Sequence, residues 1–263
     1  MTASVTVEPM SGALGAQVRG IDLRHLDDHA WGQLHDLWLE HLVLFFPDQA
    51  LDPDSHVAFA RRFGEPEIHA FAPKLDDDHL EVVVLDGVRA DEWHTDCTFS
   101  ASPPMASVLH NVICPPVGGD TVWTNQYLAY ERLSAPLRGL LDGLTAVHTA
   151  HPMGHPEVQA THPAVRIHPE TGRRSLFVNR GFTSHFVELH RPESDALLAF
   201  LYGWSEQPAF QCRFRWSAGT IALWDNRCTQ HIGVPDFEGR RLLQRVTVIG
   251  DTPVGPETVR QSR

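Results

Sequence analysis

Cysteine is scarce in this chain, lysine is almost absent, and no long apolar segment occurs. The four cysteines lack C-x-x-C spacing and the density of a disulfide scaffold, so we expect buried free thiols in a cytoplasmic protein. No stretch approaches the ~18 uninterrupted apolar residues of a membrane span, and the N-terminus lacks the basic and apolar segments of an export signal. We therefore expect neither a membrane span nor a signal peptide.

Positive charge is also in short supply. Acidic residues number 33 against 21 basic ones, Lys74 is the single lysine, and the net charge is −12 with His neutral. Without a basic run or stripe, we expect no nucleic-acid partner. A small anion would have to be held by a few placed arginines, and we expect a small-molecule partner of this kind. The oligomeric state stays open, including a dimer or tetramer of identical chains.

Nothing in the chain marks an internal boundary. Its 263 residues are 42% hydrophobic and 21% charged, which is ordinary for a globular protein. Gly and Pro, 19 each, are scattered rather than pooled in a linker, and the chain shows no internal repeat. We therefore expect one domain over residues 1–263.

Hydrophobic patterning predicts many short strands and a few helices. Apolar residues at helical spacing predict helices within 26–44, 125–141 and 193–202, the second broken at Ser134-Ala135-Pro136. Asp52-Pro53-Asp54 predicts a capped helix start ahead of 56–63. Strand-like runs lie at residues 43–46, 81–85, 106–113, 176–178, 211–216, 220–224 and 242–249. This mixture favours a mainly β fold with flanking helices around a β-sandwich or jelly-roll core.

The tripeptide His94-Thr95-Asp96 is the first candidate for chemistry among 17 histidines. In a strand, residues i and i+2 point to the same face, so the imidazole and the carboxylate would converge. A third ligand from elsewhere would complete a 2-His-1-carboxylate set, which leaves coordination positions open on Fe(II). Taken alone, the tripeptide is a weak signal, and a polar turn beside Trp93 would be the more frequent explanation.

Two further polar segments follow apolar strands near the C-terminus. The first is Trp224-Asp225-Asn226-Arg227-Cys228-Thr229-Gln230-His231, and the second runs from 240 to 247 and contains Arg241 and Arg245. In a strand these two arginines share a face, about 13 Å apart. Two inward guanidiniums need anionic partners, whereas either one alone also fits a surface salt bridge.

Together these segments resemble the Fe(II)/2-oxoglutarate-dependent dioxygenases of the taurine dioxygenase (TauD/TfdA) family over nearly the whole chain. Further landmarks of the resemblance are Gly118-Gly119-Asp120-Thr121, Leu176-Phe177-Val178-Asn179 and Gly181-Phe182. The resemblance implies a double-stranded β-helix core with iron held by His94, Asp96 and His231. It also implies hydroxylation of a small molecule with O2, and succinate and CO2 as co-products.

The resemblance further implies two anion sites. Arg241 and Thr121 would bind the distal carboxylate of 2-oxoglutarate, and a planar guanidinium suits that carboxylate because it donates two parallel hydrogen bonds. Arg245 would meet an anionic group on the prime substrate.

The resemblance assigns five positions to the prime-substrate pocket: His69, Ala90, Cys97, Phe182 and Arg245. Three alanines depart from the taurine enzymes. Ala90 stands where those enzymes have Asn, and Ala72 and Ala150 stand where they have aromatic residues. We therefore expect a wider, more apolar pocket for an alkylsulfonate, alkyl sulfate or carboxylate-bearing anion other than taurine.

Two alternatives come from other classes. A zinc-dependent hydrolase on a jelly-roll scaffold could use two histidines and an aspartate, but would not need Thr121 and Arg241 at their offsets. A non-catalytic, metal-binding cupin-like protein would not need the anchor for 2-oxoglutarate.

Overall fold

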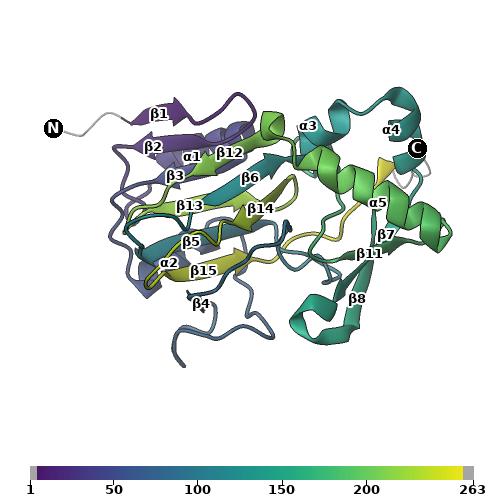
Figure 1. The fold of residues 1–263 in the computed structure, drawn as a ribbon. Helices are drawn as coiled ribbons and strands as arrows, with labels where there is room; N and C mark the ends of the chain where they lie inside the picture. The colour runs from purple at the N-terminus through teal and green to yellow at the C-terminus, as the bar shows by residue number, and fades with distance from the viewer. Residues whose placement is uncertain (1–4, 257–263) are drawn as a thin grey trace.

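Two β-sheets face each other in the computed structural model, which describes residues 5–256 (Figure 1). The large sheet has the order β1 (Thr6–Pro9), β2 (Ala16–Arg19), β3 (Val43–Phe46), β13 (Ile221–Asp225), β5 (Ala106–Ile113), β15 (Leu242–Val248) and β4 (Val83–Asp86). The small sheet has the order β12 (Gln211–Phe214), β6 (Thr121–Asn125) and β14 (Thr229–Gly233). All neighbouring strands are antiparallel except β2 and β3.

Aromatic side chains fill the space between the two sheets. Phe45 of the large sheet stacks on Phe214 of the small sheet at 4.0 Å between ring centroids. Trp123 of β6 meets the edges of Phe45 and Trp224 at 5.2 and 5.8 Å. Aromatic pairs of this geometry add to the stabilisation from buried area. This interleaved core is the jelly-roll layer that the strand pattern predicts.

Two helices cover the outer face of the large sheet. These are α1 (Asp28–His41) and α2 (Pro53–Arg61), and the side chains of Asp27 and Asp52 cap them by accepting hydrogen bonds from Ala30 N–H and Ser55 N–H. Trp38 of α1 is fully buried in the apolar cluster formed with this face of the sheet.

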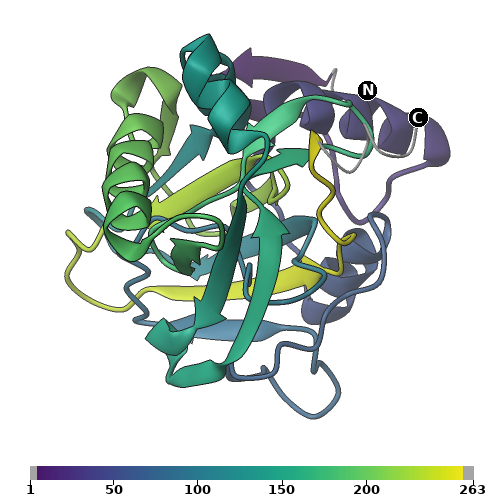
Figure 2. The same ribbon diagram turned by 90° about the vertical axis from the view of Figure 1, so that its right-hand side faces the viewer.

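A third layer closes one end of the sandwich (Figure 2). It contains α3 (Gln126–Glu131), α4 (Ala135–Leu141), α5 (Arg191–Ser205), and a sheet of order β11 (Thr183–Phe186), β7 (Thr145–Ala150) and β8 (His155–Pro163). The β9 (Val165–Ile167) and β10 (Arg174–Leu176) pair and the 3-10 turns η1 (His151–Met153) and η2 (Pro208–Phe210) complete it. The β7–β8 hairpin is drawn in teal in front of the sandwich in Figure 2, with α5 beside it in green.

The predicted fold class is confirmed, and so are the helices, including the break at Ser134 between α3 and α4. The strand predicted at 176–178 is wrong in part. β10 ends at Leu176, and Phe177 N–H donates to the carbonyl of Ala164 outside any strand (2.8 Å). The patterns miss β1, β2, β6, β7, β8, β9, β11 and β14; β8, for example, has a single buried residue, His162, and so lacks a buried apolar face. Within residues 5–256 no helix is both long and apolar enough to cross a membrane.

Candidate metal and anion site

Backbone hydrogen bonds bring His94 and His231 together although 136 positions separate them in the sequence. The two residues form an isolated antiparallel bridge, in which each N–H donates to the other's carbonyl at 3.0 and 2.8 Å. His231 belongs to β14, whereas His94 lies outside the named strands.

The predicted strand through His94, Thr95 and Asp96 is wrong. Only His94 makes a bridge, and Asp96 begins a turn in which Cys97 has a left-handed φ of 45°. The residue before this turn is tied to the strand that carries His231, since Thr95 Oγ1 donates to the carbonyl of Thr229 in β14 at 2.8 Å. The side chains of His94 and Asp96 nevertheless converge.

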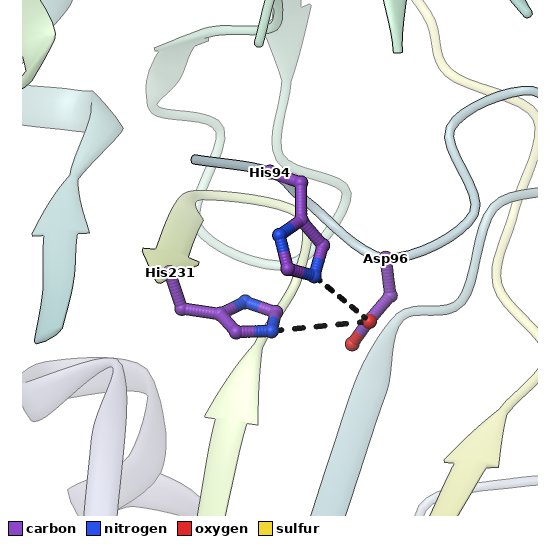
Figure 3. Close-up of side chains that lie close together, drawn as sticks. All are labelled: His94, Asp96 and His231. Atoms are coloured by element: carbon purple, nitrogen blue, oxygen red, sulfur yellow. Dashed lines mark ion pairs between the residues drawn. The ribbon is translucent and has the colours of Figure 1, made fainter. Parts of the chain in front are cut away.

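Three ligand atoms meet at one point (Figure 3). The Nε2 atoms of His94 and His231 lie 3.8 and 3.9 Å from Oδ1 of Asp96. One ligand atom from each residue lies within 4.8 Å of the other two. This is the donor set of a 2-His-1-carboxylate site.

The charge states of these groups suit a cation. His94 Nδ1 must donate to the carbonyl of Glu92 (2.7 Å), so Nε2 of the neutral ring carries the lone pair that faces Asp96. Burial lowers the pKa of both His94 and His231. Burial alone would raise the pKa of Asp96, but Arg245 and the two imidazoles bring it below its usual range. Arg245 Nη1 donates to Oδ1 of Asp96 at 2.5 Å. The imidazole lone pair has no bridging proton between it and this same Oδ1, which fits a divalent metal between the two atoms.

A cavity of about 800 Å³ opens onto this cluster. Its lining includes all five residues predicted for the prime-substrate pocket: His69, Ala90, Cys97, Phe182 and Arg245. Val88 and Met153 add apolar surface nearer its mouth. Ala72 and Ala150 are not part of the lining, and Ala150 is buried against Cys97 and Phe99.

His69 is a neutral hydrogen-bond donor in this cavity. Its Nδ1 accepts the backbone N–H groups of Phe71 and Ala72, both at 3.1 Å, so the proton is on Nε2, which lies 3.3 Å from Cys97 Sγ. Burial, with a smaller contribution from Arg245, lowers the pKa of His69 to about 4. The positive charge beside the cluster therefore comes from Arg245 rather than His69, and Nη1 of Arg245 also donates to Oδ1 of Asp96 at 2.5 Å.

Arg241 and Thr121 line a narrower cavity on the other side of the cluster, together with His94, His231 and Arg245. Arg241 is buried, its side chain makes no hydrogen bond or ion pair within residues 5–256, and its Nε has no partner. Burial lowers the pKa of this guanidinium. A buried charge without a counter-ion is costly, so the geometry fits an anionic ligand.

Two neighbours prepare this anion site. Trp216 Nε1 donates to Thr121 Oγ1 at 2.9 Å, which leaves the hydroxyl proton of Thr121 free for a ligand. Gly119 has a φ of +72°, and a Cβ there would lie 3.2 Å from Cδ and Nε of Arg241. The glycine of this motif therefore allows the backbone to approach the arginine closely.

Sequence reasoning missed Ser107 and Trp216, which contact Asp96 and Thr121 directly. Ser107 offered a signal, because it is a polar residue near the start of an apolar strand. Trp216 offered none, since an aromatic residue at a strand end is ordinary.

The chain matches the family model described as "Taurine catabolism dioxygenase TauD, TfdA family" over residues 6–247. It is 37% identical to an alpha-ketoglutarate-dependent sulfate ester dioxygenase of Pseudomonas putida, with 95% of this chain and 91% of that protein covered. It is 34% identical to an alkylsulfatase of Acinetobacter baylyi, with 97% and 88% covered. The solved structure of a taurine dioxygenase from Burkholderia xenovorans matches with a TM-score of 0.90 at 42% identity, covering 97% of this chain and 92% of that one.

Proposed function

This chain belongs to the taurine catabolism dioxygenase TauD, TfdA family and is a 2-oxoglutarate-dependent dioxygenase, and we propose that His94, Asp96 and His231 hold its iron. Its substrate is a small organic anion larger than taurine, bound in the wider cavity. The alternatives of a zinc-dependent hydrolase and of a non-catalytic metal-binding protein are excluded by the family.

One observation carries the assignment of the two cavities. Arg241 is a buried guanidinium without an anionic partner within residues 5–256, and it lines only the narrow cavity, whereas Arg245 lines both cavities and pairs with Asp96. An iron in the cluster supplies the activation of O2, with 2-oxoglutarate as the source of electrons. Arg241 and the hydroxyl of Thr121 bind the distal carboxylate of 2-oxoglutarate and orient it toward the cluster.

The residues of the wide cavity position the prime substrate. The guanidinium of Arg245 and the Nε2–H of His69 bind its anionic group, and the ring of Phe182, 5.9 Å from that of His94, contacts its carbon chain. In this proposal, a C–H bond near the anionic group of the substrate lies beside the metal cluster. Hydroxylation at a carbon that bears a sulfate ester oxygen gives an unstable product that releases sulfate and an aldehyde.

The cavity supports an alkyl sulfate or sulfonate better than taurine. Ala90, Val88 and Met153 present apolar surface, and the carboxylates at its rim, Asp91 and Glu92, are exposed to solvent. A desolvated ammonium close to the sulfonate would lack a partner, at a cost of about 1–3 kcal/mol or more. The named activities of the Pseudomonas and Acinetobacter relatives support the same substrate class.

A substrate panel tests this function. Linear alkyl sulfates and alkylsulfonates of increasing length, an aryloxy carboxylate and taurine are compared by O2-dependent succinate formation and by sulfate or sulfite release. We expect kcat/KM to rise with chain length, since each added buried methylene contributes ~0.8 kcal/mol until the cavity is filled. Under anaerobic conditions the protein with Fe(II) and 2-oxoglutarate should show a weak visible absorption band, which a hydrolase would not give. The highest kcat/KM for taurine, or Arg245→Ala without effect on any anion, would refute this substrate assignment.

A further inference from the structure

A chain of hydrogen bonds lies behind Asp96, on the side away from the two imidazoles. Ser107 Oγ donates to Oδ2 of Asp96 at 2.7 Å, and Asn226 Nδ2 donates to Ser107 Oγ at 2.8 Å. Trp224 Nε1 donates to Asn226 Oδ1 at 2.9 Å, and the N–H of Asp96 points to the same oxygen at 3.4 Å. The side chains of all four residues are buried.

The donor and the acceptor of each side-chain hydrogen bond in this series can be assigned uniquely. An indole N–H can only donate, so the amide oxygen of Asn226 faces Trp224 and its NH2 group faces Ser107. An ionised carboxylate can only accept, so the hydroxyl proton of Ser107 lies on the bond to Asp96. The bonds therefore run in one direction and end on Oδ2.

These residues come from rigid parts of the fold. Ser107 lies in β5 and pairs in register with Trp224 of β13, at the centre of the large sheet. Asn226 lies in the turn between β13 and β14, five residues before His231. This series of hydrogen bonds thus links the segment that carries Asp96 to the segment that carries His231.

We propose that Ser107 and Asn226 are positioning residues for the metal site, a role that rests on the proposed function. They hold Oδ2 of Asp96, so that Oδ1 is the oxygen presented to the cation. Oδ1 lies 3.8 and 3.9 Å from the two imidazole nitrogens and also accepts a hydrogen bond from Arg245 Nη1 at 2.5 Å. They fix the orientation of the carboxylate but do not touch substrate or 2-oxoglutarate.

Titration of the metal-free protein with Co(II) alone tests this role, with the visible absorption of bound Co(II) as a second readout. We expect Ser107→Ala to bind Co(II) about 10–100-fold more weakly, as for other residues that orient metal ligands. The absorption spectrum should change as well, because the freed Oδ2 can join the coordination. Ser107→Thr, which keeps a hydroxyl, should restore both readouts.

A double-mutant cycle shows whether Asn226 acts on Asp96 through Ser107 or whether the two residues act independently. If Asn226 acts through Ser107, then Asn226→Ala should weaken Co(II) binding in the natural protein and add little in the Ser107→Ala variant. Additive effects would overturn the linked chain.

Ser175→Ala is the matched control. Ser175 is also fully buried, and its hydroxyl donates to the carbonyl of Arg227, in the same turn as Asn226, at 2.9 Å. It should lose stability without any change in Co(II) affinity or spectrum. Equal affinity and identical spectra for Ser107→Ala and the natural protein would overturn the positioning role. Co(II) binding that persists in His231→Ala would instead overturn the proposed metal site.

Discussion

Two buried clusters that combine histidine with aspartate lie in the described part of this molecule, and one of them is suited to hold a metal. Within residues 5–256 they are the open cluster, His94, Asp96 and His231, and the closed cluster, His168, Asp225 and Cys228. Both draw on the segment from 224 to 231, and both place their ligand-type atoms within 4.8 Å of one another.

In the closed cluster every acceptor of the carboxylate is already used. Asp225 Oδ1 accepts Nε and the backbone N–H of Arg227, each at 2.9 Å. Its Oδ2 accepts Nη2 of Arg227 at 2.7 Å and Nε2 of His168 at 3.0 Å. Nδ1 of His168 accepts the backbone N–H groups of Glu170 and Thr171. Burial would raise the pKa of Asp225, but Arg227 and His168 bring it below its usual range.

The open cluster differs in access and in unused lone pairs. Two cavities reach it, the Nε2 atoms of His94 and His231 face Oδ1 of Asp96 at non-bonding distances, and Nδ1 of His231 has no partner. In the closed cluster Arg227 and His168 thus use both carboxylate oxygens. In the open cluster Arg245 pairs with Oδ1 of Asp96, but the Nε2 atoms of both imidazoles stay available for the proposed metal.

The largest contrast between the clusters should follow from removing one imidazole from each. His231→Ala should reduce 2-oxoglutarate turnover by more than about 100-fold, because it removes a metal ligand rather than a group behind one. His168→Ala should instead lower the free energy of unfolding by about 1–3 kcal/mol, because it removes a buried hydrogen bond, and should leave Co(II) affinity unchanged. Succinate assays, Co(II) titration and denaturant unfolding measure these effects. A His231→Ala variant with full activity would show that the open cluster is not the catalytic metal site.

Replacing one buried arginine near each cluster, Arg227 beside the closed one and Arg241 beside the open one, should change the free energy of unfolding differently. Arg227→Met should cost about 3–5 kcal/mol of stability, since it leaves Asp225 charged, buried and without its main partner. Arg241→Met, which removes an unpartnered charge, should leave the free energy of unfolding unchanged or raise it. It should also raise the apparent constant for 2-oxoglutarate about 30-fold or more. Equal destabilisation by the two substitutions would mean that Arg241 has a structural counter-ion after all.

The smallest expected effect is that of pH on substrate binding by His69, the neutral hydrogen-bond donor beside the open cluster. Because the pKa of His69 is about 4, the ring stays neutral above about pH 5, and affinity for an anionic substrate should change by less than about 2-fold between pH 6 and 8. If His69 had the ordinary pKa of 6.5 and bound the anion as an imidazolium, the affinity would fall about 30-fold over that span, because the protonated fraction falls by that factor. His69→Gln, which keeps an N–H donor, should give the same flat profile. The free energy of unfolding, in contrast, should depend on pH. It should fall as the pH drops from about 6.5 toward 4, since His69 is protonated at a higher pH in the unfolded chain than in the folded one.

Motifs in the sequence predict much of the site. His94, Asp96 and His231 converge as expected. Arg241 and Arg245 line one cavity, as two residues on one face of a strand would, although β15 begins only at Leu242, after Arg241. The strand predicted through His94 and Asp96 is wrong because local alternation is not what orients Asp96. Its carboxylate oxygens are instead hydrogen-bonded by Ser107 and Arg245, which lie 11 and 149 positions away in the sequence.

The sequence by itself determined the fold class, the family and the kinds of side chain available to each site, because strand patterning and motif spacing are written along the chain. Only the tertiary structure decided which of those side chains remain unpaired. Within residues 5–256, Arg227 pairs with Asp225 whereas Arg241 has no carboxylate partner. His168 hydrogen-bonds Asp225 whereas Nδ1 of His231 has no partner there, because hydrogen-bond partners come from segments far apart in the sequence. A group's charge state and free lone pairs depend on burial and on those partners, which no local pattern specifies.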